Sequence, residues 1–247
     1  MKDLDAYESF YKIKSFEEIQ VYYRRKKLLE VMDKYQHNSI LEIGCGMDPL
    51  FMHIEDYQYM TVVEPGDYFY ENAVMLSEKD NRIVCLKGFF EDELNNLAKR
   101  QPFDYIFASM LTELEDIERG YHAIQQLCTE NTIVYLCVPN AISLHRIIAY
   151  EAGIIKDISV ISERGKKLLQ RREAYTMAQL CTQVEEYGFK VLEKGSYFPK
   201  LFTHQQMQSM LEQNIISKDV LEGMYKMEKY FPEYGSEIYV ACVNSEL

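Results

Sequence analysis

A glycine turn that follows a short apolar segment constrains the fold of this chain most strongly. Residues 40–43 are apolar apart from Glu42 and lead directly into Gly44-Cys45-Gly46. Glycine adopts backbone conformations that other residues avoid, and it lets a ligand approach the main chain closely. A second, mostly apolar segment, residues 60–63, ends at Glu64, 20 residues after Gly44. An acid at the end of the next strand can bind a ribose diol, so these two segments predict a site for a nucleoside-containing cofactor.

The same alternation continues along the chain and predicts the fold class. Short apolar segments alternate with longer segments that have helical spacing of their apolar residues. The predicted strands are residues 40–43, 61–63, 83–86, 103–108, 132–138, 189–192 and 237–243. Strands that alternate with helices are typical of an α/β protein with a parallel, doubly wound sheet. The carboxyl ends of such strands share one edge of the sheet, where ligands bind.

We expect one domain that spans residues 1–247. The alternation of strands and helices breaks after Pro139, where longer helical segments follow. The predicted parts are an N-terminal helical segment (1–36), a cofactor-binding core (37–140), a helical lid insertion (141–177) and a C-terminal core (178–247) with a helical insertion at 203–230.

Composition excludes several classes of function. The formal net charge of -12 argues against a general nucleic-acid binder, because phosphate neutralisation needs a basic surface. The six cysteines are scattered and form no C-x-x-C pair, so we expect a reduced protein without a metal site. No apolar run approaches the roughly 20 residues that span a bilayer. We therefore expect a cytoplasmic protein that does not associate with membranes.

Details of the turn favour S-adenosyl-L-methionine (SAM) over a dinucleotide. A dinucleotide fingerprint has a third glycine, which lets the following helix pack closely and receive the pyrophosphate. In this chain Asp48-Pro49 stands near that place. Glu42, at the end of the first strand, suits an ammonium group better than a pyrophosphate. SAM carries an ammonium group and a sulfonium, and no phosphate.

On these motifs the chain resembles the class I SAM-dependent methyltransferases, and in particular bacterial small-molecule methyltransferases of the ubiquinone-methylase-like type. The resemblance is firm over residues 37–140 and weaker over most of the rest. Its motifs are residues 41–46, 63–65, 88–92, 103–109, 114–116 and 138–146, with less specific matches at 174–176, 187–189 and 197–200. The resemblance implies a Rossmann-like, seven-stranded and mainly parallel sheet with an antiparallel last strand and helical lid additions. It also implies SAM as cofactor and S-adenosyl-L-homocysteine (SAH) as product.

The resemblance assigns roles to the residues that match its motifs. It places the turn beside the methionine part of SAM, Glu42 near the ammonium group and Glu64 on both ribose hydroxyls. The adenine would lie against Pro65, Phe90 and Glu91, and Ser109 and Met110 would line the methyl-transfer channel. The full set of expected cofactor residues is Glu42, Gly44, Cys45, Gly46, Glu64, Pro65, Phe90, Glu91, Ser109 and Met110.

The acceptor site is harder to predict. His145 follows the fifth predicted strand and His204 lies in a candidate lid segment, so either could take a proton from an acceptor hydroxyl. A basic cluster beside a pocket could also bind an anionic acceptor. The candidate substrate residues are Arg146, Arg171, Tyr175 and Lys200. A solvated helical face is the alternative for the basic segments, and the same two interpretations apply to Arg24 and Arg25.

We therefore expect an enzyme that transfers a methyl group from SAM to a small molecule. The family favours an O-methyltransferase that acts on a hydroxyl or anionic oxygen of a metabolite, sugar or phosphoryl compound, with a homodimer as one expected state. The alternatives are a SAM-binding regulatory or scaffold protein without catalysis and an NAD-dependent oxidoreductase.

Overall fold

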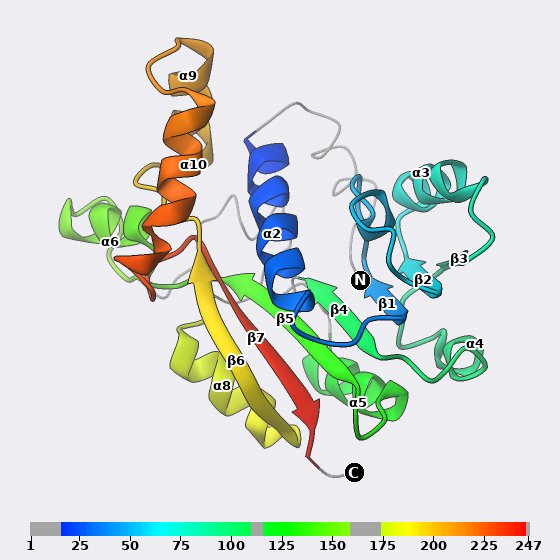
Figure 1. The fold of residues 1–247 in the computed structure, drawn as a ribbon. Helices are drawn as coiled ribbons and strands as arrows, with labels where there is room; N and C mark the ends of the chain where they lie inside the picture. The colour runs from blue at the N-terminus through cyan, green and yellow to red at the C-terminus, as the bar shows by residue number, and fades with distance from the viewer. Residues whose placement is uncertain (1–15, 110–115, 159–173, 246–247) are drawn as a thin grey trace.

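A seven-stranded sheet in the order β3-β2-β1-β4-β5-β7-β6 forms the centre of the molecule (Figure 1). The computed structural model describes residues 16–109, 116–158 and 174–245. The strands are β1 Ser39–Ile43, β2 Tyr59–Glu64, β3 Ile83–Lys87, β4 Tyr105–Ser109, β5 Ile133–Pro139, β6 Phe189–Tyr197 and β7 Glu237–Asn244. The pairs among β1 to β5 are parallel, and β7 runs antiparallel to both β5 and β6. The predicted Rossmann-like fold is confirmed.

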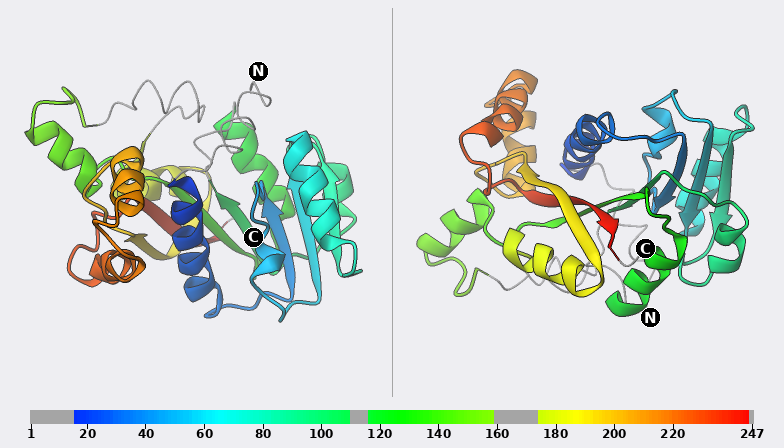
Figure 2. Two further views of the ribbon diagram at one scale, coloured as in Figure 1. Left: turned by 90° about the horizontal axis from the view of Figure 1, so that it is seen from above. Right: turned by 60° about the horizontal axis from the view of Figure 1, so that its bottom comes forward.

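Helices cover both faces of the sheet (Figure 2). Their bounds are α2 Glu17–Met32, α3 Asp67–Ser77, α4 Leu94–Ala98, α5 Ile117–Leu127, α6 Leu144–Glu151, α8 Met177–Glu186, α9 His204–Glu212 and α10 Lys218–Lys226, with the 3-10 turns η1 Leu50–Met52 and η3 Met227–Lys229. Residues of α2, α3, α9 and α10 belong to one apolar core, and residues of α4, α5 and α8 belong to the other. The predicted division of the chain into core and lid parts stays a prediction, and residues 159–173 of the predicted lid lie outside the described residues.

Two elements differ from the sequence-based expectation. The short helix expected after the glycine turn is only the 3-10 turn η1, and the strand expected at 189–192 continues to Tyr197. β6 is an edge strand that pairs with β7 as far as Tyr197 and Glu237. Charged residues such as Glu193 and Lys194 are tolerated on an edge strand, and they hide its periodicity in the sequence.

α2 lies across one face of the sheet and has two different halves (Figure 1). Its carboxyl-terminal half buries Leu28 and Val31 in the core, whereas its amino-terminal half buries charged and polar residues, Arg24 among them. Arg24 donates hydrogen bonds to both carboxylate oxygens of Glu237 at the start of β7, at 2.9 and 2.7 Å. The hydroxyl of Tyr197 donates to the same carboxylate. A solvated face is therefore the wrong interpretation of this part of α2, which is fixed to the sheet by a buried ion pair.

Removal of the Arg24 cation should destabilise the protein strongly. Arg24→Met leaves the buried carboxylate of Glu237 without its partner, which should cost about 3–5 kcal/mol of unfolding free energy in urea titrations. The double variant Arg24→Met/Glu237→Leu should recover most of this loss, because the carboxylate of Glu237 is removed with its cation. Buried Glu17, which lies 3.4 Å from Arg24, keeps its contact with His204. Lys34→Met, which breaks an exposed pair with Glu193, should change stability by less than about 1 kcal/mol. Equal losses in the two single variants would contradict the role given to Arg24.

Candidate cofactor and acceptor site

The glycine turn leaves open space above its backbone. Gly44 and Gly46 have φ values of +77° and +57°, a region that side chains with a Cβ rarely adopt. A Cβ built on either residue would meet no other atom within 4 Å. The N–H of Gly44 donates to the carbonyl of Val63 at 2.8 Å, which ties the turn to β2. The turn therefore forms an open surface on which a ligand can contact the main chain.

Glu64 lies beside the glycine turn, at the end of β2. Its carboxylate is 5% exposed and accepts backbone N–H groups from Gly66 at 2.9 Å and Gly46 at 3.1 Å. A carboxylate offers about four acceptor positions, so these two hydrogen bonds and a weak thiol contact from Cys45 at 3.7 Å leave acceptor capacity on Glu64. Burial raises the pKa of Glu64, and this effect outweighs the backbone hydrogen bonds that lower it. The geometry suits a diol that donates two hydrogen bonds.

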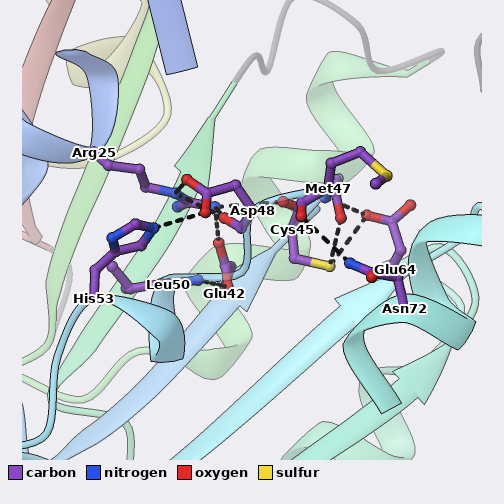
Figure 3. A network of polar contacts seen from close by, with 10 residues as sticks. Arg25, Glu42, Cys45, Met47, Asp48, Leu50, His53, Glu64 and Asn72 are labelled. Carbon is purple, nitrogen blue, oxygen red and sulfur yellow. Dashed lines mark hydrogen bonds and ion pairs between the residues drawn. The ribbon is translucent and has the colours of Figure 1, made fainter. Parts of the chain in front are cut away.

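Glu42 has partners inside the protein. Its carboxylate is fully buried, with one oxygen 2.5 Å from Nη2 of Arg25 and the other accepting the N–H of Leu50 at 2.9 Å (Figure 3). Arg25 also donates to the carbonyl of Asp48. Burial raises the pKa of Glu42 although the guanidinium of Arg25 opposes that shift. The sequence left Arg25 open between an acceptor-binding residue and a solvated one, and nothing in the local pattern indicates that it pairs with Glu42.

The residues expected around the adenine and the transfer channel have varied environments. Phe90 is buried in the apolar core with Leu97, while its neighbour Phe89 is 36% exposed. Pro65 and Glu91 are half-buried, and so is Ser109 at the end of β4. Met110 lies outside the described residues.

The structure places Lys200 and His204 in contact, and both act electrostatically on His145. Buried Lys200 donates to Oε1 of Gln20 at 2.8 Å, and its Nζ lies 2.6 Å from Nε2 of His204. Nδ1 of His204 lies 3.3 Å from a carboxylate oxygen of Glu17. Burial, followed by the charges of Lys200, His204 and neighbouring Arg146, lowers the pKa of His145 well below its ordinary value. Nδ1 of His145 is buried and has no hydrogen-bond partner among the described residues.

The other expected substrate residues are placed differently. Arg146 donates to the backbone carbonyls of Ala141 at 3.1 Å and Ile158 at 3.2 Å. Tyr175 is buried in the apolar core that also contains α8, and its hydroxyl accepts a hydrogen bond from Gln183 at 3.0 Å. Arg171 lies outside the described residues.

Two further properties of the described residues bear on function. No group of three or more His, Cys, Asp or Glu side chains in residues 16–109, 116–158 and 174–245 could hold a metal ion. None of the helices described is both long enough and apolar enough to span a membrane.

Comparison with known families identifies the chain. A family model described as a methyltransferase domain matches residues 16–194. The chain belongs to the methyltransferase family. The comparison with curated proteins finds no match. The fold and the family together make the protein a class I SAM-dependent methyltransferase, so the expectation of such an enzyme is confirmed and the expectation of an NAD-dependent oxidoreductase is not supported.

Solved methyltransferase structures share the fold at low sequence identity. A chain of the Haloferax volcanii complex that contains the Trm112 methyltransferase activator is 9% identical, with a TM-score of 0.62 over 99% of this chain and 98% of that one. The plantazolicin methyltransferase BamL, solved with SAH, is 14% identical, with a TM-score of 0.57 over 96% and 90% of the two chains. A SAM-dependent methyltransferase from Mesorhizobium loti is 12% identical, with a TM-score of 0.52 over 83% and 90%.

The cofactor of this methyltransferase is SAM, and the site has room and partners for it. SAM supplies a methyl group on a sulfonium and carries the ribose diol that the sequence predicts. The backbone of Gly44 and Gly46 is open on one side, and Glu64 presents a carboxylate of the kind that accepts hydrogen bonds from a diol, so the residues present fit this cofactor.

Loss of the Glu64 carboxylate should weaken cofactor binding. Glu64→Ala removes the acceptor proposed for the ribose hydroxyls, so affinity for SAH should fall by about 1–3 kcal/mol in isothermal titration calorimetry. Asp67→Ala is the matched control, since Asp67 is an exposed acid three residues further along the chain and pairs only with exposed Lys87 among the described contacts. Unchanged affinity in Glu64→Ala would mean that the ribose binds elsewhere.

Cofactor affinity should also depend on pH. Ribose hydroxyls donate to the ionised carboxylate, and the pKa of Glu64 is raised above its ordinary value of 4.5. Affinity for SAH should therefore fall as the pH is lowered, beginning at a pH above 4.5. Because the pKa of Glu42 is also raised, Glu64→Gln isolates the effect, and its weaker binding should vary less with pH. An identical pH dependence in both proteins would assign the titration to another group.

Proposed function

We propose that this methyltransferase transfers the SAM methyl group to an oxygen atom of a small molecule, and that the acceptor binds beside His145, Lys200 and His204. The gathering of these three side chains is the observation that carries the proposal. His145 follows β5, and Lys200 and His204 follow β6, so all three lie beyond the carboxyl ends of these strands. The glycine turn and Glu64 follow β1 and β2 at the same edge, where ligands of such sheets bind.

The cofactor residues are proposed from the same edge. Gly44, Cys45 and Gly46 border the methionine part of SAM, Glu64 binds the ribose and Pro65 borders the adenine. The carboxylate of Glu42 is committed to Arg25 and to the N–H of Leu50, so any effect on the ammonium group passes through the turn.

His145 is the proposed proton acceptor. Its lowered pKa keeps the imidazole neutral at neutral pH, so the form that accepts a proton is present. SAM, when bound, would supply the methyl group, and the imidazole of His145 would take the proton that the acceptor hydroxyl loses. Buried Lys200 and half-buried His204 would orient the acceptor and exclude water, which promotes an in-line displacement.

A small acceptor agrees with the charge of the protein. The net charge of -12 disfavours a polyanion such as nucleic acid, whereas a small molecule can enter a locally polar pocket. A cytoplasmic location and a homodimer stay predictions.

Substitution of His145 should reduce turnover and leave cofactor binding intact. In a screen of hydroxyl-containing acceptors that measures SAH release, His145→Asn should lower kcat by about 10²–10⁴-fold, the usual contribution of a general base. Its affinity for SAH should match that of the unmodified protein. His122→Asn, on the exposed side of α5, is the control. Full activity in His145→Asn would remove His145 from the reaction, and methylation of amines alone would overturn the oxygen preference.

A further inference from the structure

The connection between β1 and β2 lacks the usual support of a glycine-rich cofactor turn. In related nucleotide folds a third glycine lets a helix pack closely behind the turn and face the ligand with its amino terminus. In this chain residues 44–58, all of them described, contain no α-helix and only the single 3-10 turn η1. Asp48-Pro49 occupies the region of the third glycine. The left-handed conformations of Gly44 and Gly46 must therefore be held in another way.

Arg25 reaches the turn from α2. Its Nε and Nη2 donate to the carbonyl of Asp48 at 3.1 and 2.5 Å, and Nη2 lies 3.4 Å from the carbonyl of Cys45. The guanidinium lies over the ring of Phe107 on β4, 5.0 Å from its centroid. A guanidinium is a planar, rigid fork, so these contacts fix the carbonyls at two positions of the turn.

Glu42 completes the arrangement from β1. One carboxylate oxygen pairs with Nη2 of Arg25, and the other accepts the N–H of Leu50, where η1 begins. Both side chains are almost completely buried. An ion pair in such surroundings is screened little by water, so it resists small displacements of the chain between Cys45 and Leu50.

We propose that Arg25, together with Glu42, is a positioning residue for the cofactor turn and takes the place of the missing third glycine and helix. Figure 3 shows Arg25 and Glu64 on opposite sides of the turn, so the ion pair acts from the side away from the proposed ribose contact. The proposal rests on the assignment of this turn to SAM. It gives Glu42 a role through Arg25 and the backbone of the turn.

A direct contact between Arg25 and the cofactor is the competing explanation. Nη1 of Arg25 is buried and has no hydrogen-bond partner among the described residues, and the methionine part of SAM carries a carboxylate. The two explanations differ in their effect on 5′-methylthioadenosine, which has the nucleoside of SAM but no amino-acid part. A direct contact would leave its affinity unchanged, whereas a disordered turn would weaken it.

The double variant Arg25→Met/Glu42→Leu tests the proposal. It removes both charges, so neither is left buried alone, and thermal unfolding checks that the protein stays folded. In the protein without ligand, amide hydrogen exchange at Gly46 and Leu50 should be about tenfold faster or more. Affinities for SAH and for 5′-methylthioadenosine should both fall by about tenfold or more in calorimetry.

Two further variants keep the result decisive. Lys26→Met, which breaks the partly exposed pair with Glu222, is the matched control and should change neither exchange nor affinity. Arg25→Lys keeps the charge without the planar fork, so it should show intermediate exchange and affinity even if the double variant does not fold.

The other possible results also show whether Arg25 positions the turn. Unchanged exchange at Gly46 and Leu50 would overturn the proposal, and so would a loss of SAH affinity with unchanged affinity for 5′-methylthioadenosine. If the unmodified protein bound neither SAH nor SAM, the cofactor assignment would fail, whereas the exchange rates would still show whether Arg25 holds the turn.

Discussion

The burial of two consecutive arginines at the carboxyl edge of the sheet is the interaction on which the rest of the site depends. Arg24 pairs with Glu237 at the start of β7, and Arg25 pairs with Glu42 on β1. A buried charge without a partner is costly, so α2 can occupy only the position that satisfies both pairs. Successive residues of a helix point about 100° apart, which lets adjacent side chains reach different strands. One helix thereby ties the cofactor side of the edge to the acceptor side.

Two glutamates that look alike in the sequence have different surroundings. Glu42 is the last residue but one of β1 and Glu64 is the last residue of β2, and burial raises the pKa of both. Glu42 is enclosed by Arg25 and the N–H of Leu50. Among the residues that the structure describes, Glu64 accepts backbone N–H groups and a weak thiol contact. Glu64 therefore keeps acceptor capacity for a ligand, and Glu42 supports the backbone against which that ligand lies. The two glutamates thus differ in role because they have different hydrogen-bond and ion-pair partners, although both are buried and of the same residue type.

The sheet and the glycine turn could be predicted because short stretches of sequence determine them. The contacts that assemble the site could not, because they join separate segments of the chain. The strands before β6 are apolar and the turn requires glycine, so each is visible within a few residues. The contacts between Lys200 and Gln20 and between Arg25 and Glu42 join residues far apart in the chain. No periodicity indicates such partners. The prediction of a helix after the glycine turn was wrong for a different reason. A third glycine would let such a helix pack behind the turn, and in our proposal Arg25 of α2 takes its place.

The charges at the carboxyl edge of the sheet bear on the choice between the two expected acceptor types, a hydroxyl and an anionic oxygen. The buried cations Arg24 and Arg25 pair with Glu237 and Glu42. Lys200 contacts His204, which in turn contacts Glu17. A permanently anionic acceptor would have to enter this edge of the sheet at the cost of its own desolvation. A neutral hydroxyl has a smaller desolvation cost, and in the proposed reaction its proton passes to the imidazole of half-buried His145. The smaller desolvation cost is the reason that the function proposed above names a hydroxyl, rather than a carboxylate or phosphate, as the group that receives the methyl.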